Sequence, residues 1–393
     1  MKDSKLIMVV TGEASSDQHA AAVITALKKF KPDWHVFAMG GHYLAQAGAE
    51  LLVDIKTHGS VMGLTEVLGS AGKIIKAFKT LEHAAAEKKP DLVMLVDYPD
   101  FNLRLAKKLH GQGFSILYFI SPQLWAWRQG RAKIIKRCVK KVATIFPFEE
   151  VFYRGLGINA EFVGHPFMDR KPLALDREKF CHDLGLDPAK PIVALLPGSR
   201  KKEIETLLIV LVQTIMELRK TLPDVQAIIP IAPTVKEHWL APAQPLPAGV
   251  VMINGQAIET LAVADAGIIA SGTAAMEGAL AELPMMVVYK LTSLSYFFAQ
   301  RLIGGVKNFA MPNIIAGKEI VREFVQEQVN PIVLAAELAK LLTDEQYRTE
   351  KKQQLRLVKE QLKHRQQGEM TAGERVAQII IELGNESGNE SGR

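Results

Sequence analysis

Short, mostly apolar runs alternate with longer amphipathic stretches in the first part of the chain. Residues 6–10 are apolar throughout, and a loop at 11–16 separates them from an amphipathic stretch at 17–30. This order predicts a strand, a loop and a helix. Similar runs predict further strands at 36–39, 92–96, 116–120 and 142–146. Because strands without polar alternation are buried on both faces, the pattern indicates a parallel, doubly wound sheet covered by helices.

The pattern starts again after a polar, proline-containing stretch at residues 169–190. The second set of predicted strands lies at 192–196, 226–231, 250–253, 266–270 and 285–289, with helices at 203–220 and 273–281. We therefore expect an α/β fold of two Rossmann-like domains that face a cleft. Ligands of such sheets bind at the carboxyl ends of the strands.

The expected domain limits follow from this restart. The first domain takes residues 1–168 and is completed by C-terminal helices at about 365–383, and the second domain takes residues 169–364. Residues 384–393, which include a polar NESGNES sequence, are expected to form a disordered tail.

Composition narrows the class of protein. Hydrophobic residues make up 48% of the chain and charged residues 23%, values typical of globular proteins. Two cysteines are too few for a disulfide framework, and because Cys138 and Cys181 have no CxxC partner, neither a thiol redox motif nor a cysteine-based zinc site is indicated. The first apolar run is too short for a signal peptide, and no run of about 18 uncharged apolar residues occurs. We therefore expect no spanning helix and a cytoplasmic location.

The chain is modestly basic. Its net charge of +6 and pI of about 9.1 favour anionic partners, such as nucleotide phosphates, anionic lipid heads or nucleic acid. Residues 128–141 hold seven basic residues and no acid, a run typical of a solvated helix face, with contact to phosphate or an anionic membrane as the alternative. Because no aromatic residues are interleaved with this run, we expect no nucleic-acid partner.

The first candidate site is the loop that follows the strand at 6–10. It places Gly12, Ser15 and Ser16 before a helix, where free backbone N–H groups could bind a phosphate or a sugar. The loop matches neither GxGxxG nor a P-loop. Taken alone, it is better explained by capping of the helix by Ser16 or Asp17.

Asp97 directly follows the strand at 92–96, and Asp100 and Asn102 come close behind. A carboxylate at this position can take a proton from an attacking hydroxyl, and an amide can orient that hydroxyl. The alternative is a proline turn in which Asp100 caps the next helix. We take Asp97 as the candidate general base.

Two tryptophans, Trp125 and Trp127, follow the strand at 116–120, shortly after Ser121 and Pro122. Tryptophans at such a place can stack on a sugar, although they more often serve in packing.

Two loops of the second half indicate nucleotide binding. Their candidate residues are Gly198, Ser199, Arg200, Ser271, Gly272, Thr273 and Glu277. Glycine lets the backbone approach a ligand, and the guanidinium of Arg200 can grip a diphosphate. The small and hydroxyl residues of the second loop lie at the N-terminus of a helix, where a phosphate could bind. Glu277 could accept hydrogen bonds from the hydroxyls of a ribose. A capped helix would explain either loop alone, but both occur at corresponding strand ends.

An amphipathic segment at residues 59–78 could touch acyl chains or a membrane. Its apolar candidates are Met62, Val67, Leu68, Ile74 and Ile75. Lysines interleave them, and such a helix usually packs its apolar face into the core. Glycines that weaken the helix favour a partly exposed, membrane-touching or acyl-binding element instead. Residues 294–303 invite the same two interpretations. Lone His165 is interpreted as structural, and we assign no metal.

Several strings in order resemble the lipid A disaccharide synthase family, from about residue 5 to residue 383. They lie at residues 12–17, 62–68, 97–102, 121–127, 146–149, 163–166, 196–200, 271–277 and 311–313. The resemblance implies an inverting glycosyltransferase of the GT-B type without a cofactor. It implies transfer of 2,3-diacylglucosamine from UDP-2,3-diacylglucosamine to 2,3-diacylglucosamine 1-phosphate, giving a β-1,6-linked disaccharide 1-phosphate and UDP.

The resemblance also implies roles for individual residues. Asp97 is the expected base, Ser15 and Asn313 are polar site residues, and Arg200 contacts the diphosphate. The family forms homodimers, in some cases with exchanged C-terminal segments, and acts at anionic lipids on the inner face of the inner membrane. One departure is Ser16, which stands where the family usually has glycine and puts a positive φ there in doubt.

Two other functions stay open from the residues. One is a UDP-GlcNAc epimerase-like enzyme of the same architecture. The other is a nucleotide-sugar-binding peripheral membrane protein without turnover.

Overall fold

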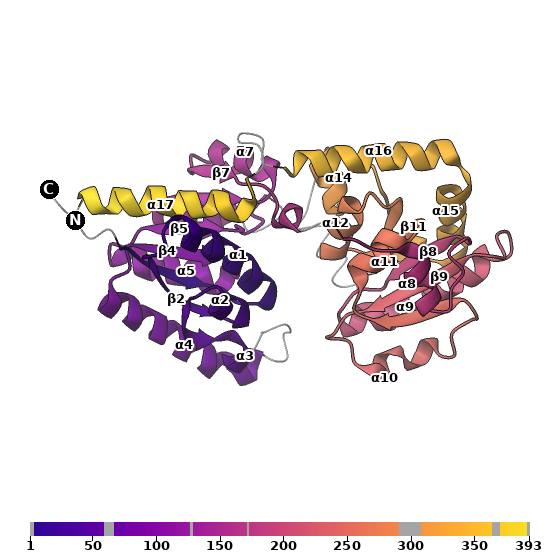
Figure 1. Ribbon diagram of the computed structural model, residues 1–393, viewed down its shortest axis with the longest axis horizontal. Coiled ribbons are helices and arrows are strands. Elements are labelled where there is room, and N and C mark those ends of the chain that lie inside the picture. The colour runs from indigo at the N-terminus through magenta and orange to yellow at the C-terminus, as the bar shows by residue number, and fades with distance from the viewer. Residues whose placement is uncertain are drawn as a thin grey trace. The chain divides into compact units, whose positions relative to one another are not determined.

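The computed structural model describes residues 4–58, 67–125, 129–170, 173–290, 308–363 and 370–390. The chain divides into two compact units (Figure 1). The first unit combines residues 1–170 with residues 362–393, and the second unit holds residues 171–361. Each unit is an α/β sandwich around its own parallel sheet, which confirms the fold class expected from the apolar runs.

Seven strands form the sheet of the first unit, in the order β3-β2-β1-β4-β5-β6-β7, among the residues that the structure describes. Their bounds are β1 Leu6–Val10, β2 His35–Gly40, β3 Glu50–Asp54, β4 Leu92–Val96, β5 Ile116–Phe119, β6 Lys141–Thr144 and β7 Ala160–Phe162. All neighbours pair in parallel. β1 lies between β2 and β4, so the connections from β1 and from β4 leave toward opposite edges of the sheet.

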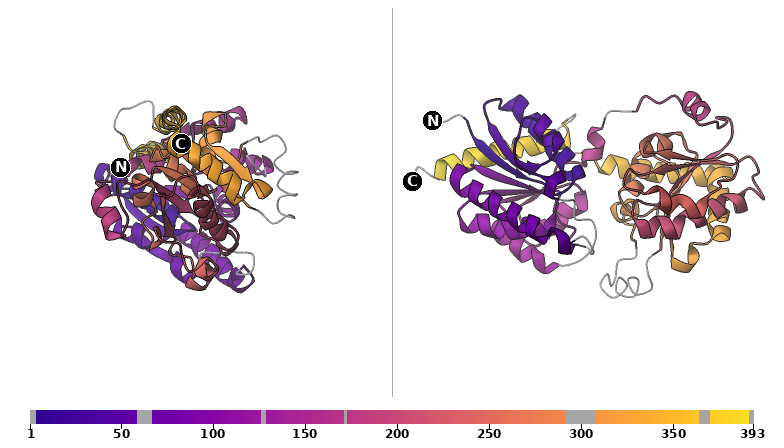
Figure 2. Two further views of the ribbon diagram at one scale, coloured as in Figure 1. Left: turned by 90° about the vertical axis from the view of Figure 1, so that its right-hand side faces the viewer. Right: turned by 90° about the horizontal axis from the view of Figure 1, so that it is seen from below.

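Helices cover both faces of this sheet (Figure 2). Their bounds are α1 Ala14–Phe30, α2 His42–Gln46, α3 Ile55–His58, α4 Val67–Lys88, α5 Pro99–Gly111, α6 Ala132–Cys138, α7 Pro147–Gly155 and α17 Ala372–Glu390. Alternate residues of β1 face opposite sides. Ile7 and Val9 belong to the core under α1 and α17, and Met8 and Val10 belong to the core under α4 to α7.

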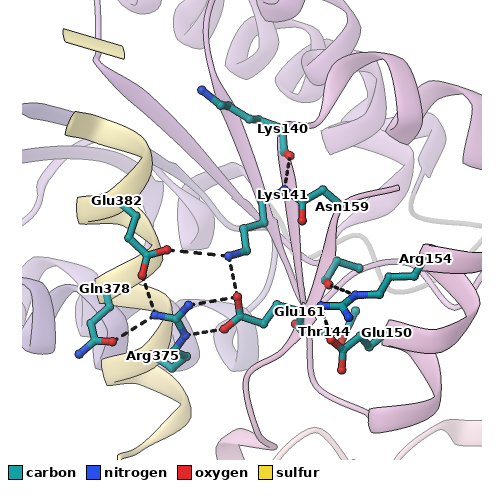
Figure 3. A network of polar contacts seen from close by, with 11 residues as sticks. Lys140, Lys141, Thr144, Glu150, Arg154, Asn159, Glu161, Arg375, Gln378 and Glu382 are labelled. Atoms are coloured by element: carbon teal, nitrogen blue, oxygen red, sulfur yellow. Dashed lines mark hydrogen bonds and ion pairs between the residues drawn. The ribbon is translucent and has the colours of Figure 1, made fainter. Parts of the chain in front are cut away.

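The last helix, α17, lies beside α1 on the first sheet (Figure 1). Asp169 accepts hydrogen bonds from the backbone N–H groups of Ala372 (3.0 Å) and Gly373 (3.2 Å) at its start. Farther along, Arg375 donates to the Glu161 carboxylate of β7 (3.1 Å), which also pairs with Lys141 of β6 at 2.6 Å (Figure 3). These contacts tie the C-terminal segment to the first unit.

The expectation of a disordered tail at residues 384–393 is wrong for most of that segment, because α17 continues to Glu390. Leu383 is buried, and Gly384 lies so close to Trp34 that a β-carbon there would stand 2.9 Å from the indole. Packing therefore extends into the first tail residues. Once a helix is formed and packed, further residues add to it without a new nucleation step.

The second unit has a six-stranded sheet in the order β10-β9-β8-β11-β12-β13, again parallel throughout in its described part. The strands are β8 Ile192–Leu196, β9 Gln226–Ile231, β10 Val250–Asn254, β11 Ala266–Ala270, β12 Met285–Tyr289 and β13 Arg322–Val325. The helices are α8 Arg177–Asp183, α9 Lys201–Leu218, α10 Glu237–Leu240, α11 Ala257–Val263, α12 Thr273–Leu280, α14 Met311–Ala316, α15 Pro331–Thr343 and α16 Glu345–Gln361. β8 and β11 are the central neighbours whose connections diverge.

Candidate functional site

Each sheet has one point where the connections of neighbouring strands diverge, and open α/β sheets bind ligands there. In the first unit this point lies between β1 and β4, where Val10 pairs with Leu95. The loops that follow these strands touch each other. The Tyr98 ring covers the backbone of Gly12, so a β-carbon on Gly12 would lie 2.2 Å from Tyr98 Cγ.

Asp97 lies at the carboxyl end of β4 in an unusual backbone conformation. Asp97 and Tyr98 both have φ of +48°, in the left-handed region that L residues rarely adopt. The Asp97 carbonyl accepts hydrogen bonds from the Tyr118 hydroxyl (2.8 Å) and from Asn102 Nδ2 (2.7 Å). Such left-handed residues cost about 1–3 kcal/mol each and persist where surrounding contacts hold them, often at functional sites.

The Asp97 carboxyl group is partly buried. Burial raises its pKa, and a hydrogen bond from the Tyr98 backbone offsets part of this effect. A raised pKa makes the carboxylate a stronger base.

The other polar residues of this turn hold its structure. Asn102 is fully buried and donates to the carbonyls of Val96 and Asp97, so it holds the turn rather than orienting a substrate hydroxyl. Asp100 is exposed and pairs with Arg131. The N-cap position of α5 is occupied by Tyr98, not by Asp100.

The first loop is held by its serine and aspartate. Ser16 accepts hydrogen bonds from the backbone N–H groups of Gly12 (3.3 Å) and Glu13 (3.1 Å), so it caps α1 from within the first turn. Ser16 lies in the helix without a positive φ. Asp17 is buried and accepts from Gly41 (2.6 Å) and Tyr43 (3.0 Å). Ser15, by contrast, is exposed on the first turn of α1.

His165 lies buried beside the crossing out of the first unit. Its ring Nδ1 accepts a hydrogen bond from the Phe167 backbone N–H (3.2 Å), and the backbone N–H of His165 donates to the Leu362 carbonyl (3.0 Å). Burial, then His19 and Arg170, lower the pKa of His165 to about 3. A neutral imidazole that accepts from the backbone two residues along the chain serves the structure.

In the second unit the divergence point lies between β8 and β11, where Leu196 pairs with Ile269. Because β8 and β11 are neighbours, the two loops expected to bind a nucleotide, at residues 198–200 and 271–277, lie at the same edge of the sheet. Gly198 has φ of +100°, and a β-carbon there would lie 2.3 Å from Glu203 Oε2. Glu203 accepts from the backbone N–H groups of Ser199 (3.0 Å) and Arg200 (3.1 Å). The backbone N–H groups of this loop are therefore occupied by a carboxylate of the same chain.

Arg200 extends into solvent. Its side chain is 76% exposed and meets Glu203 only at 3.5 Å. The guanidinium is thus available to a ligand.

The loop at β11 is more open. Gly272 has φ of +147°, and among the described residues beyond its chain neighbours no atom lies within 4 Å of the place where its β-carbon would be. Within the described part of the chain, the N-cap residue Gly272 makes no side-chain cap at the start of α12, and Thr273 is exposed there. Ser271 donates to the Tyr289 hydroxyl, which donates to the Phe309 carbonyl at 3.1 Å. Glu277 lies one turn into the helix.

Asn313 is fully buried, and all four of its hydrogen-bonding positions are used. Its Nδ2 donates to the Val321 carbonyl and to Glu323 Oε1, both at 2.7 Å, while Oδ1 accepts from Ile320 and Val321. Glu323 also accepts from the Phe309 backbone at 2.9 Å. Asn313 therefore braces the segment that supports Tyr289 and leaves no polar atom for a substrate in this structure.

The amphipathic segment is only partly described. Met62 and residues 294–303 lie outside the described residues, as do the side chains of Val67 and Leu68. Ile74 packs against the core of the first unit, whereas Ile75 is 57% exposed. The described helices include none with the length and apolar character to cross a membrane. The described residues also form no group of three or more His, Cys, Asp or Glu side chains placed to hold a metal ion.

Sequence reasoning missed the side chains that hold these loops. Tyr118 lies inside β5, where nothing in the pattern sets it apart from core residues. Glu203 had a readable signal, because it stands three residues after the N-cap residue Arg200, where a glutamate caps a helix. Tyr289 ends β12, the strand next to the Ser271 loop.

Comparison with known proteins identifies the family. The family model described as lipid-A-disaccharide synthetase matches residues 7–380. A lipid-A-disaccharide synthase of Koribacter versatilis is 39% identical over 381 residues, which are 96% of this chain and 98% of the relative. The Myxococcus xanthus enzyme of the same name is 40% identical over 384 residues, 98% of each chain.

Solved structures share the fold at low identity. UDP-GlcNAc 2-epimerase from Neisseria meningitidis bound to UDP-GlcNAc has a TM-score of 0.62 at 13% identity, covering 96% of this chain and 98% of that one. The glycotransferase of kitacinnamycin also has a TM-score of 0.62, at 14% identity, covering 98% of this chain and all of that one (100%). The sequence matches carry the assignment: the chain belongs to the lipid-A-disaccharide synthetase family of glycosyltransferases.

Proposed function

We propose that the protein transfers 2,3-diacylglucosamine from UDP-2,3-diacylglucosamine to the 6-hydroxyl of 2,3-diacylglucosamine 1-phosphate, with inversion at the anomeric carbon. The products are the β-1,6-linked disaccharide 1-phosphate and UDP. The observation that carries this proposal is the strained turn at Asp97, held by Tyr118 and Asn102 at the divergence point of the first sheet.

Asp97 acts as the general base. It takes the proton of the acceptor hydroxyl as that oxygen attacks the anomeric carbon, and the bond from this carbon to the UDP oxygen breaks. The electron pair of the broken bond leaves with UDP. The raised pKa of Asp97 favours this transfer, because the carboxylate holds a proton more tightly than an exposed aspartate would. Ser15, exposed on α1, is the proposed polar contact nearby.

The donor's diphosphate gains charge as it leaves. We assign its binding to Arg200 and to the open start of α12 at Gly272 and Thr273, with Ser199 as a further contact and Glu277 on the ribose. Loss of one such donor costs about 3 kcal/mol of transition-state stabilisation, by analogy with oxyanion sites. The proposed reaction needs no metal.

Both substrates carry acyl chains, so we place the enzyme at anionic lipids of the inner membrane, on its inner face. Exposed Ile75 and the basic residues of α4 are the proposed contacts. We also expect a homodimer, as the family resemblance implies.

Asp97→Asn tests the proposed base. The wild type, given both diacyl substrates, should form a disaccharide 1-phosphate and UDP, detected by mass spectrometry. Asp97→Asn should lower kcat by about 100-fold or more, the usual worth of a positioned base. Asp100→Asn, on the same turn but exposed, is the matched control and should stay within about 2-fold of wild type.

The results separate the rival functions. Near-normal kcat in Asp97→Asn removes Asp97 as the base. Conversion of UDP-GlcNAc in the absence of a lipid acceptor would indicate an epimerase instead. Binding of UDP-sugar without any product would indicate a protein that has lost turnover.

Membrane contact is tested by flotation with phosphatidylglycerol vesicles. Ile75→Ser should lower the bound fraction several-fold, because an exposed apolar side chain no longer enters the lipid. Leu357→Ser, at an equally exposed leucine of the second unit, is the control. An unchanged bound fraction for Ile75→Ser would remove this contact.

A further inference from the structure

The loop that carries Trp125 begins beside the proposed base. It follows β5, which pairs with β4 so that Val96 lies opposite Phe119. The Asp97 backbone N–H donates to the Phe119 carbonyl at 3.0 Å. Ser121 to Trp125 therefore leave the sheet one strand away from Asp97, a separation of about 5 Å between neighbouring strands.

Helix α7 holds this loop at two points. Glu149 and Tyr153 lie four residues apart, on one face of the helix. The Tyr153 hydroxyl donates to the Pro122 carbonyl at 2.7 Å, and Trp125 Nε1 donates to Glu149 Oε1 at 3.3 Å. Phe148 packs edge-to-face against the indole, with ring centroids 5.1 Å apart. Trp125 is thus fixed in place, yet it remains partly exposed.

Glu149 is an unusual choice for a packing position. Glu149 is only 1% exposed, and it forms no ion pair with any of the described residues. Burial raises the pKa of Glu149 to about 8, although hydrogen bonds from Trp125 and the backbone of Phe146 lower it in part. The carboxyl group is therefore mainly protonated at neutral pH.

Two polar atoms of this cluster, Glu149 Oε2 and Ser121 Oγ, are buried without a hydrogen bond of normal geometry in the described structure, because the Phe146 backbone near Glu149 and the Tyr153 hydroxyl near Ser121 do not reach that geometry. A buried polar group without a hydrogen bond costs about 1–3 kcal/mol, so a cluster that served packing alone would be more stable with apolar side chains. This cost, next to a fixed and partly exposed indole at the catalytic edge of the sheet, indicates a functional role for the loop.

We propose that Trp125 forms the platform on which the glucosamine ring of the acceptor lies, and that Glu149 is the positioning residue that sets the indole. The inference rests on the proposed function and names the acceptor subsite of that reaction. An indole offers a large, rigid apolar face with a polar edge, which suits the C–H face of a sugar ring. Fixing that ring beside Asp97 holds the acceptor hydroxyl in reach of the base.

Steady-state kinetics with each substrate varied in turn test the proposal. Trp125→Ala should raise the acceptor KM by about 10-fold, the order expected for a lost aromatic contact, while the donor KM stays within about 2-fold. Trp125→Phe keeps a ring but loses the N–H group, and it should give an intermediate acceptor KM. Glu149→Ala should resemble Trp125→Ala. Glu149→Gln should restore the acceptor KM, because its amide oxygen still accepts from the indole.

Matched controls are Trp239→Phe in the second unit and Glu150→Gln, the neighbour of Glu149 that pairs with Arg154 on the surface of α7. Melting temperatures show whether a variant has lost its fold. Calorimetric titration with 2,3-diacylglucosamine 1-phosphate in detergent micelles measures acceptor binding without turnover.

The outcomes are distinct. An acceptor KM and affinity unchanged in a folded Trp125→Ala overturn the platform. Failure of Glu149→Gln to restore what Glu149→Ala loses overturns the positioning role. If the wild type forms no disaccharide but Trp125→Ala still weakens acceptor binding about 10-fold, the proposed function fails and the subsite stands.

Discussion

The Tyr98 ring lies over the backbone of Gly12, with the place of a missing β-carbon 2.2 Å from Tyr98 Cγ. Tyr98 follows Asp97 directly and shares its left-handed backbone. The loop after β1 and the turn after β4 are therefore packed as one body, and a change in either loop displaces the carboxylate proposed as the base.

Gly12→Ala should disturb this body. The new methyl group must push the Tyr98 ring away, which costs about 1–3 kcal/mol as overpacking and lowers kcat through Asp97. Urea denaturation and steady-state kinetics measure the two effects. Gly111→Ala is the control, because open space surrounds Gly111 in α5 and a helical alanine is favourable. Wild-type kcat in Gly12→Ala would show that Asp97 does not depend on this contact.

Tyr118→Phe removes one of the two hydrogen bonds on the Asp97 carbonyl. We expect a loss of about 1 kcal/mol in the free energy of unfolding and a several-fold lower kcat with both KM values unchanged. Tyr347→Phe is the control, because it loses a hydroxyl that donates to Glu337 in the second unit. It should lower the free energy of unfolding and leave kcat unchanged. Equal effects of both variants on kcat would contradict a specific role for Tyr118.

Glu203→Gln tests whether the diphosphate takes the place of a carboxylate. If the donor binds at Ser199 and Arg200, Glu203 repels it, so the neutral amide should lower the donor KM several-fold. The acceptor KM should not change. Glu205→Gln changes an exposed glutamate two residues farther along α9 that pairs with Lys201, and it is the matched control. A donor KM that stays constant or rises in Glu203→Gln would place the diphosphate elsewhere.

His165 makes stability depend on pH. The folded protein lowers the pKa of this imidazole to about 3 and so keeps it neutral above that pH, whereas the unfolded chain protonates it below the usual pKa of 6.5. The unfolded state thus binds more protons between these values, and the free energy of unfolding falls as the pH drops from about 6.5 toward 3. His165→Asn keeps an acceptor for the Phe167 N–H group and should lose less stability over this interval. Parallel curves for both proteins in urea titrations from pH 7 to pH 4 would contradict this.

Arg375→Met should loosen α17. Burial alone would raise the pKa of Glu161, but Arg375 and Lys141 outweigh it and lower the pKa. Their stabilisation is present above the unfolded value of 4.5 and is lost as the pH falls through the lower folded value. At pH 7 the free energy of unfolding of the variant should be lower than that of the wild type by on the order of 2 kcal/mol, and hydrogen exchange in α17 should be faster. At acid pH this difference in the free energy of unfolding should be smaller. Lys190→Met, from an exposed pair with Asp224, should change little.

The apolar runs predicted the inner strands well, and the strands that they missed are at the edges of the sheets. β3 and β7 close the first sheet on its two sides, and β13 closes one side of the second. Edge strands have one neighbour and less need for burial, so β3 begins with Glu50 and β13 with Arg322. β7 has only three residues, too few to form a pattern.

Only those residues of the candidate site that follow the end of a predicted strand could be found from the sequence. Asp97 and Arg200 could be picked out because each follows a buried strand, and their proposed roles still need the tests above. The partners of these residues come from distant positions, such as Tyr118 on Asp97 and Val321 on Asn313. Hydrogen bonds between elements depend on packing, so the sequence alone could not show that the Asn313 amide is fully used.

The docking of α17 on the first sheet has a consequence for biosynthesis. Residues 1–170 leave the ribosome with α1 but without α17, the second helix on the same face of their sheet, and residues 171–361 must be made before α17 arrives. At about 5–20 residues per second, that delay is roughly 10–40 seconds. Throughout it, α1 alone covers the side of the nascent sheet that carries Ile7 and Val9, and the apolar surface that α17 will bury stays in contact with water.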